Sequence, residues 1–400
     1  MAVLFFIVFI DLLGFGIVIP LLPFYAEHFG ASPDRVTLVM ASYSLAQFVF
    51  APIWGRLSDR FGRRPILLVS LVFSIASYLW LGFADALWML YGARLLAGAG
   101  AGNIAAAQAY VADITPPEGR AKGMGMVGAA LGLGFTIGPA LGGLIAGADP
   151  TAAAVALPAF VAAALSATAF VGTLVFLRES LPAGAARLPR PSRWRMAQAA
   201  FGRPDLRRLV LLLFITVTVF AGMETTFALW ANRAFGWGPR QVGAMFFFLG
   251  MVMIVIQGGL IGRLSRRFGE ARLLVAGSLA FVVGLAGLPL AGSLPLVLLA
   301  TALLALGMGL ASPSANSLIS RRAGAGEQGG ILGVAQSASS LARIVGPALA
   351  GAAFAQWGRN APYYLSAVVM LLVVALAISV LRGEATAPAL AASPQPEEGT

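Results

Sequence analysis

Long apolar runs alternate with short polar connections along almost the whole chain. A helix that crosses the hydrocarbon of a bilayer needs about 20 mostly apolar residues, and each run approaches that length. We therefore predict an all-α membrane protein with twelve transmembrane helices. The predicted spans are 3–23, 36–54, 66–84, 87–110, 123–146, 152–177, 208–230, 241–261, 273–291, 295–317, 329–353 and 361–381.

The composition agrees with this pattern. Hydrophobic residues make up 59% of the chain and charged residues 11%, whereas soluble domains are roughly one quarter charged. The first run, Ala2–Pro23, is too long for the apolar part of a signal peptide and lacks a small-residue cleavage site. We expect it to be the first membrane helix.

Arginine residues gather on alternate connections, and this arrangement predicts the orientation. Cytoplasmic loops are enriched in Lys and Arg, so both termini and the loop 178–207, including Ser192, should be cytoplasmic. The net charge of +11 then reflects loops that face anionic lipid rather than nucleic acid. The basic connections contain Arg56, Arg60, Arg63, Arg64, Arg120, Lys122, Arg263, Arg266, Arg267, Arg272, Arg321 and Arg322, besides the arginines between 178 and 208.

The longest connection, 178–207, divides the chain into a bundle at 1–177 and a bundle at 208–382. Within it, Pro191–Phe201 combines arginines with apolar residues, which suits either a helix on the cytoplasmic lipid surface or a plain linker. The tail 383–400, rich in Ala, Pro, Glu and Ser, is expected to be a disordered cytoplasmic tail.

The two halves contain related segments. Gly55–Gly62 recurs as Gly262–Gly269, and Gly138–Leu141 recurs at nearly the same spacing as Gly346–Leu349. This repeat predicts two pseudo-symmetric six-helix bundles related by an axis along the membrane normal. Such repeats are typical of transporters that bind substrate between the bundles and alternate their access, and they argue against an enzyme.

Four segments resemble motifs of a known family. Gly55–Pro65 resembles the loop between helices 2 and 3 of the major facilitator superfamily, and Asp11–Pro23 is similar to the first-helix motif of its twelve-helix drug:proton antiporters. Leu90–Gly100 resembles the fourth-helix motif, with Ala97 where that motif often has Gln, and Gly134–Gly143 resembles the fifth-helix antiporter motif. The chain looks like the tetracycline-resistance efflux proteins in particular.

This resemblance implies the major facilitator fold and proton-coupled export of amphipathic small molecules or drugs. It also implies a monomer without a cofactor, embedded in the bacterial cytoplasmic (inner) membrane. The tetracycline exporters carry acids within helices 3 and 9, but Ser77–Trp80 and the span from Leu273 to Ala291 contain none. Tetracycline as a substrate is therefore in doubt.

Two alternatives stay open: proton-coupled uptake of a sugar or other metabolite, and a membrane receptor that transports nothing. The fifth-helix motif favours export. A metal site is not expected, because the chain has no cysteine and one histidine, His28, in a short polar connection.

The loop Gly55–Pro65 suggests a gate. Gly55 would let helix 2 approach a neighbour closely. Asp59 would cap a facing helix, which the family resemblance implies is the eleventh. Arg63 is placed to pair with Asp59 four residues earlier, and Asp113 could receive an arginine of this cluster, which includes Arg60. In the second copy Arg266 and Glu270 replace Asp59 and Arg63, which predicts a weaker latch.

Glycines at intervals of four crowd the fifth predicted helix, including Gly128, Gly132 and Gly138. Such a stripe permits close helix packing, and Pro139 removes a backbone hydrogen bond and should bend the helix. We expect a hinge or seal around Gly138 and Pro139; ordinary packing is the alternative.

Four ionisable residues fall well inside predicted spans: Asp11, Arg94, Glu224 and Arg343. An unpaired charge at a helix centre costs about 2.5–3.5 kcal/mol, so such residues usually pair or line a cavity. We interpret these four as the proton-coupling group. Asp11 could instead be purely structural, and Glu224 could reach outward to the interface.

Further polar and aromatic residues in the spans are candidates for contact with an amphipathic or cationic substrate. Together with Glu224, the candidate substrate-binding residues are Gln47, Asn103, Gln108, Phe220, Phe227, Gln257 and Asn316. The expected partners are thus a small molecule, protons and the lipid bilayer.

Overall fold

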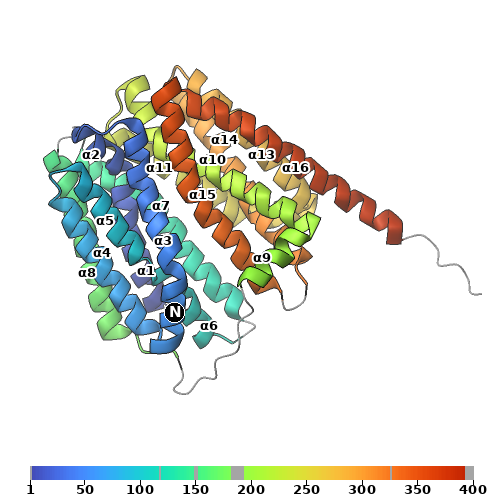
Figure 1. Ribbon diagram of the computed structural model, residues 1–400, viewed down its shortest axis with the longest axis horizontal. Coiled ribbons are helices and arrows are strands. Elements are labelled where there is room, and N and C mark those ends of the chain that lie inside the picture. Colours follow the sequence, from blue (N-terminus) through green and yellow to red (C-terminus); the bar gives the residue numbers. More distant parts are fainter. Residues whose placement is uncertain (1, 117–118, 148–151, 182–192, 325–326, 392–400) are drawn as a thin grey trace, which may run out of the picture. The chain divides into compact units, whose positions relative to one another are not determined.

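The computed structural model describes the chain except residues 1, 117–118, 148–151, 182–192, 325–326 and 392–400 (Figure 1). The described residues form helices joined by short connections and contain no β-strand. This confirms the predicted all-α membrane fold. The predicted position Ser192 lies outside the described residues.

The described residues of the first half form eight α-helices, two of which are separated only by a 3-10 turn at Ile19–Leu21. These helices are α1 (Ala2–Val18), α2 (Leu22–His28), α3 (Pro33–Phe61), α4 (Arg63–Gly82), α5 (Leu87–Ala99), α6 (Asn103–Ile114), α7 (Arg120–Ala146) and α8 (Ala152–Phe176).

The second half continues with α9 (Arg193–Gly202), α10 (Pro204–Phe235), α11 (Pro239–Ile254), a π-helical turn (Val255–Leu260), α12 (Ile261–Phe268), α13 (Glu270–Gly287), a 3-10 turn (Leu288–Leu290), α14 (Leu294–Arg322), α15 (Gln328–Trp357) and α16 (Ala361–Ala391). Glycines with positive φ, Gly62 and Gly269, end α3 and α12 at the two copies of the repeated loop. The local backbone therefore repeats along with the sequence.

Eleven helices of the described chain are long and apolar enough to cross a membrane. Every predicted span corresponds to one of these helices except the fourth span, 87–110, because the chain breaks between α5 and α6. Glycine has a low helix propensity, and Gly100 and Gly102 stand at this break. The structure therefore does not confirm the exact count of twelve.

Contacts divide the chain into two compact units. The first unit comprises residues 1–190, 218–254 and 340–362, and the second comprises 191–217, 255–339 and 363–400. Each unit takes segments from both halves of the sequence, so the predicted domains 1–177 and 208–382 remain a prediction.

In the first unit, α1 packs along α7 and α8, α4 packs on α8, and α3 packs on α5. The core around α1 is apolar and includes Leu4, Ile7 and Leu12. A Cβ atom added at Gly138 would lie 2.6 Å from Cα of Gly16, so small residues bring α7 and α1 into backbone contact.

In the second unit, α13 and α14 form the main contact. Glycines again allow it, because a Cβ at Gly277 would lie 2.9 Å from the backbone nitrogen of Ala311. The helix α9 agrees with the helical alternative for Pro191–Phe201, and its Ala200 is buried. The helix α16 continues past Arg382 to Ala391, and the disorder expected of the tail 383–400 stays a prediction.

Candidate functional site

Asp11 lies in α1 at the centre of the first unit and is only 4% exposed. Its carboxylate accepts hydrogen bonds from the Asn103 amide and from Ser166 Oγ, the latter at 3.2 Å. Asn103 is the first residue of α6, so the break in the fourth span brings a helix N-terminus beside the acid. The partial positive charge of that terminus favours a nearby carboxylate. Asp11 is therefore held by neutral groups and a helix end.

Arg94 in α5 is also buried, at 4% exposed. Its guanidinium lies over the rings of Tyr43 and Phe15, with centroids at 4.5 and 5.3 Å. The ion pairs of the described residues do not join Arg94 to Asp11, and Arg94 Nε has no hydrogen-bond partner there. Aromatic faces therefore stabilise this buried cation.

Glu224 lies in α10 within the first unit and is partly buried. Arg343, on α15 in the same unit, interacts with it electrostatically. The sequence left open which acid Arg343 would neutralise. Arg343 acts on the charge of Glu224 without an ion pair between the two among the described residues, while Asp11 has the neutral partners described above.

A second charged cluster lies at the end of the first unit where α3 meets α4; we call it the Arg63 cluster. Arg63 donates to Asp59 at 2.7 Å, to Asp113 at 2.9 Å and to Ser58 at 3.1 Å. The Arg63 side chain is 8% exposed, so this is a nearly buried pair of salt bridges. Arg63 thus pairs with Asp59 as predicted, and it is the arginine of the cluster that reaches Asp113; the gating role of the cluster stays a prediction.

Sequence reasoning missed Glu179, which follows α8 and completes the cluster. Its carboxylate accepts hydrogen bonds from the backbone N–H groups of Arg63 and Arg64, at 2.9 and 3.1 Å, and so caps the N-terminus of α4. Ser180 Oγ donates to Asp113 at 3.1 Å. Glu179 lies more than 100 positions from Arg63 in sequence, so no local spacing indicated it.

The remaining gate predictions concern Arg60, Gly55 and the capping of a facing helix by Asp59. Arg60 is exposed and lies over the Phe61 ring at 5.2 Å. The close approach predicted at Gly55 is absent among the described residues, because open space surrounds the position of its Cβ. The predicted capping of a facing helix by Asp59 stays a prediction.

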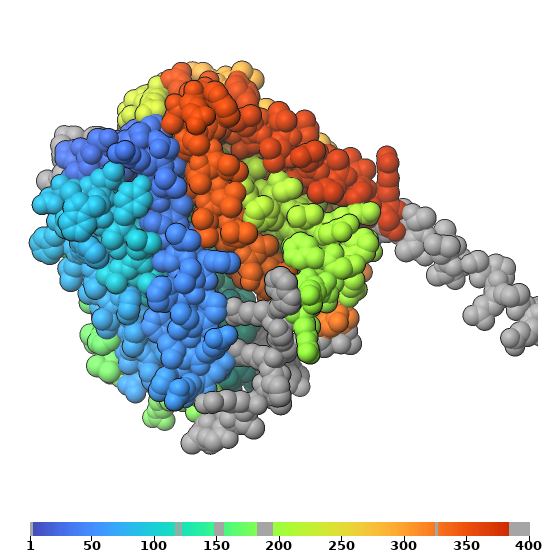
Figure 2. All heavy atoms as spheres, in the orientation of Figure 1, coloured from blue at the N-terminus to red at the C-terminus, as the bar shows by residue number. Residues whose placement is uncertain are grey.

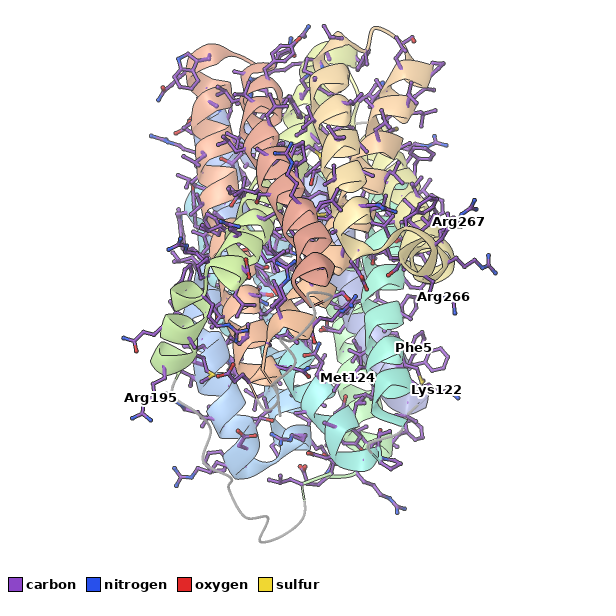
Figure 3. The ribbon with its side chains drawn as sticks, turned by 90° about the vertical axis from the view of Figure 1, so that its right-hand side faces the viewer. Phe5, Lys122, Met124, Arg195, Arg266 and Arg267 are labelled. Carbon is purple, nitrogen blue, oxygen red and sulfur yellow. The ribbon has the colours of Figure 1, made fainter. Side chains whose placement is uncertain are left out.

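The second copy of the loop carries the opposite charges. Glu270, at the position of Arg63, accepts from Arg321 Nη1 at 2.8 Å and from Ser317 Oγ at 3.3 Å within the second unit. Arg321 is 67% exposed, and exposed pairs contribute little stability. Arg266 and Arg267 point outward from their helix (Figure 3). The second loop thus has a pair, but a more solvated one.

The helix α7 uses its glycines on two sides. Gly134 and Gly138 meet α1, whereas a Cβ at Gly143 would lie 2.6 Å from the carbonyl oxygen of Pro239 in α11. Gly243 of α11 in turn faces the carbonyl of Pro139. The stripe predicted from Gly128 begins later, since Gly128 and Gly132 have no neighbour within 4 Å. A helix of the first half thereby contacts one of the second half.

The candidate substrate residues are spread over both units. In the first unit Gln47, Asn103 and Phe220 are partly buried and Gln108 is exposed, while Phe227 is 3% exposed and packs on Trp230 and Phe246. Gln257 and Asn316 are exposed residues of the second unit. Within the first unit, the structure brings Asn103 to Asp11; the substrate contacts of the whole set stay a prediction.

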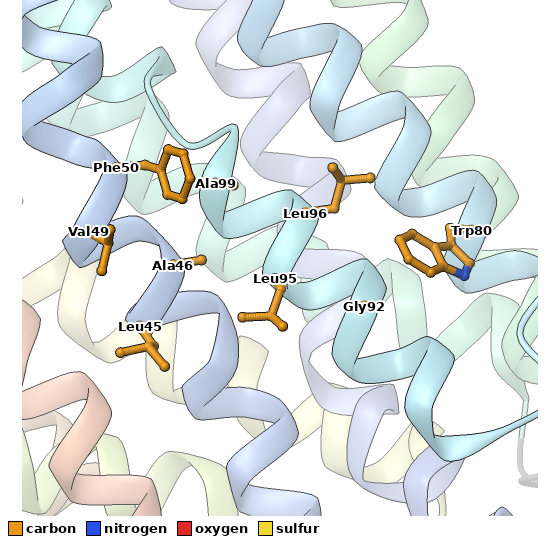
Figure 4. A pocket seen from close by; sticks show the side chains of 9 residues that line it. All are labelled: Leu45, Ala46, Val49, Phe50, Trp80, Gly92, Leu95, Leu96 and Ala99. Carbon is orange, nitrogen blue, oxygen red and sulfur yellow. The ribbon is translucent and has the colours of Figure 1, made fainter.

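A pocket of about 450 Å³ opens between α3, α4 and α5 (Figure 4). Its lining is wholly apolar: Leu45, Ala46, Val49, Phe50, Trp80, Gly92, Leu95, Leu96 and Ala99. It contains no group that could bind a proton or an ion, so it does not form part of the Asp11 site.

Comparison with known proteins places the chain in a family. The profile of the Major Facilitator Superfamily matches residues 4–347 and 258–398. The class B tetracycline resistance protein of Escherichia coli is 32% identical over 345 residues, which cover 85% of this chain and 84% of that protein. Multidrug resistance protein 2 of Bacillus subtilis (strain 168) is 33% identical over 361 residues, covering 87% and 86%.

A solved structure agrees. The human organic anion transporter MFSD10 (TETRAN) superimposes with a TM-score of 0.70 at 27% identity, covering 94% of this chain and 98% of that one. The chain belongs to the Major Facilitator Superfamily, a family of membrane transport proteins. The predicted family, with its relation to tetracycline and multidrug resistance proteins, is confirmed.

Proposed function

We propose that this protein is a secondary active transporter that exports amphipathic small molecules in exchange for protons. The observation that carries this proposal is Asp11, a carboxyl group buried in a membrane helix whose hydrogen bonds come from Asn103 and Ser166. A charge in this position is costly, and buried ionisable groups in membrane helices mark proton and substrate paths. The resistance proteins among the relatives support export as the direction.

Asp11 has partners that suit a proton carrier. The Asn103 amide and the helix N-terminus stabilise the charged form, whereas removal from water favours the neutral form. Because these influences oppose each other, a small change in hydration decides whether the carboxyl holds a proton. Alternating access supplies such a change, since it exposes the interior to each side in turn.

Glu224 is the proposed substrate-contacting acid. It interacts with Arg343 rather than with a set of neutral groups. A cationic substrate that approaches Glu224 would compete with Arg343 for the carboxylate. This arrangement favours an organic cation or an amphipathic amine as the substrate class.

We propose that the Arg63 cluster is the cytoplasmic gate. We also propose that both termini lie on the cytoplasmic side of the bacterial inner membrane. The charge distribution supports this orientation, because the basic connections lie on one side of the predicted topology. The nearly buried Arg63 with its two carboxylate partners supports a latch whose opening has a real energetic cost.

The test is transport by purified protein in proteoliposomes with an imposed pH gradient. We expect accumulation of a lipophilic cation against its gradient, with proton release into the medium when substrate is added. A panel should include a tetracycline, a lipophilic cation and a sugar. Substrate movement that is independent of the pH gradient would refute proton coupling, and movement of the sugar alone would refute drug export.

A further inference from the structure

The end of the first unit opposite the Arg63 cluster contains a separate ion pair. Arg233 Nη2 lies 3.2 Å from Glu27 Oε1. Glu27 belongs to α2 in the first half of the sequence, and Arg233 to the last turn of α10 in the second half. The salt bridges of Arg63, by contrast, stay within the first half. We call this the Glu27 end.

Two further groups hold Arg233 in place. Its guanidinium lies 4.7 Å from the ring centroid of Phe354, which is 1% exposed. Arg359 donates a hydrogen bond to the backbone carbonyl of Arg233, near the C-terminus of α10. An exposed ion pair is weak partly because two long side chains must be ordered. Here stacking on a buried ring orders Arg233, so less entropy is lost when Glu27 binds.

The surrounding contacts show that the two sequence halves meet tightly here. Thr37 of α3 is fully buried, at 0% exposed, beside Gly351 of α15, which leaves no room for a side chain. Figure 2 shows this part of α15, in orange, beside α3, in blue. Gly143 and Pro239 make a similar contact between α7 and α11. Separating the halves at this end would therefore break the Glu27–Arg233 pair and uncover Thr37.

We propose that Glu27 and Arg233, positioned by Phe354 and Arg359, form a latch that holds this end of the transporter closed. It is the counterpart of the Arg63 cluster at the other end. The proposal rests on the alternating-access function proposed above. Glu27 and Arg233 are positioning residues, because they act on the gate and not on the substrate.

The experiment measures the opening of this end without any substrate. The chain has no native cysteine, so Thr37→Cys introduces a single thiol at the closed contact. The variant is placed in lipid nanodiscs, where both faces are accessible, and its rate of modification by a charged thiol reagent is measured. Glu27→Gln and Arg233→Gln should each raise that rate at least about five-fold, the lower end of typical coupling between two states.

A double-mutant cycle tests whether the two residues act as a pair. In the variant with both substitutions, the loss of Glu27 should add nothing to the loss of Arg233. Arg35→Gln, which removes an exposed cation near the start of α3, should leave the rate unchanged. Thr173→Cys is a second control, because Thr173 is buried in the first half away from this contact and responds only to unfolding.

An unchanged rate of modification of the thiol introduced at Thr37, in either single variant, would overturn the latch, and so would additive effects in the double variant. Because the readout needs neither substrate nor protons, a failure of proton-coupled export in proteoliposomes would leave this result interpretable. Conversely, an intact latch would not by itself establish export.

Discussion

At the scale of single residues, the two acids inside membrane helices have different surroundings. Asp11 has the amide of Asn103 and the hydroxyl of Ser166, whereas Glu224 has the charge of Arg343. A carboxyl among neutral groups can exchange its proton with water when access changes, whereas a nearby cation favours the charged form and so opposes the effect of burial. The two acids should therefore fail in different ways when neutralised.

We predict that Asp11→Asn abolishes transport driven by a pH gradient but leaves the protein folded. Asparagine has nearly the same shape; its amide oxygen can accept from Asn103 and its N–H can donate to the Ser166 hydroxyl, so the free energy of unfolding should change by about 1 kcal/mol or less. Glu224→Gln should weaken binding of a cationic substrate more than it weakens coupling. Proton release and substrate binding, measured on the same preparations, separate the two effects; normal coupling in the double amide variant would exclude both acids.

At the scale of elements, the repeated loop shows how one motif gives two different structures. In the first copy Arg63 is nearly buried between Asp59 and Asp113, and in the second the charges are reversed and Arg321 is solvated. Hydrogen bonds to a buried charged group contribute about 1.5–3 kcal/mol each, whereas an exposed pair contributes about 0–1 kcal/mol.

Asp59→Asn should therefore impair transport severely at normal expression. Arg266→Asn, at the matching place in the second loop, should cost much less, because Arg266 is exposed and points outward. Equal losses of transport in the two variants, after correction for the amount of protein in the membrane, would disprove the asymmetry.

The turn between α3 and α4 gives a prediction about stability. Gly62 has a φ of +106° and a ψ of 166°, a region that only glycine occupies readily. The place of its missing Cβ is taken by the carboxylate of Glu179. Gly62→Ala should cost about 1–3 kcal/mol of strain and, by displacing the cap on α4, a further 0.5–2 kcal/mol or so.

Gly30→Ala is the matched control for that change. Gly30 also has a positive φ, +72°, but no atom lies within 4 Å of its Cβ position. The substitution Gly30→Ala should lower the free energy of unfolding by about 1–2 kcal/mol, through backbone strain alone. Thermal unfolding in detergent ranks the two variants, and a Gly30 variant as unstable as the Gly62 variant would show that the Glu179 cap adds nothing.

Glu179 should also make stability depend on pH. Burial tends to raise the pKa of its carboxyl, but hydrogen bonds from the backbone N–H groups of Leu181, Arg63, Arg64 and Ser180 outweigh burial and lower the pKa below its usual value. A lowered pKa in the folded state gives stability that is present above the ordinary carboxyl range, about 4.3, and is lost as the pH falls below it. Glu179→Gln should lower Tm at pH 7 and make little difference at strongly acidic pH; an equal deficit at both would contradict this.

At the scale of the whole molecule, much of the architecture could be predicted from hydrophobic runs. Eleven of the predicted spans have a matching helix, because long apolar segments have few alternatives in a bilayer. The fourth span was predicted as one helix, since its glycines do not interrupt the apolar pattern that defined it. A break that costs a helical turn is stabilised by tertiary contacts, and these cannot be seen in a hydropathy pattern.

The candidate site was predicted less completely. Asp11, Arg94, Asp59 and Arg63 were found because charge in an apolar run, or in a recognisable loop, is a strong local signal. Glu179 and the pair of Glu27 with Arg233 were missed, because each depends on segments far apart in sequence. The structure shows Asn103 donating to Asp11, a contact that the sequence did not indicate, and its predicted contact with substrate stays a prediction.

Labelling of introduced cysteines tests the orientation of the chain. A cysteine in place of Arg195, an exposed residue of α9, should react only with reagents that reach the cytoplasm. A cysteine in place of Asp85, exposed between α4 and α5, should react in intact cells with a reagent that cannot cross the membrane. The reverse pattern would invert the proposed topology.

The break between α5 and α6 has a mechanical consequence. An unbroken helix behaves as a stiff rod, so a tilt at one end is carried to the other. Here α5 packs on α3 and α4, while α6 contacts α1, α4 and α7 as well as α3. A glycine swivel between them would let α5 tilt with the Glu27 end while Asn103 of α6 stays hydrogen-bonded to Asp11. A movement at one end of the first unit would then not have to be passed on to the opposite end, so the two ends could move at different times.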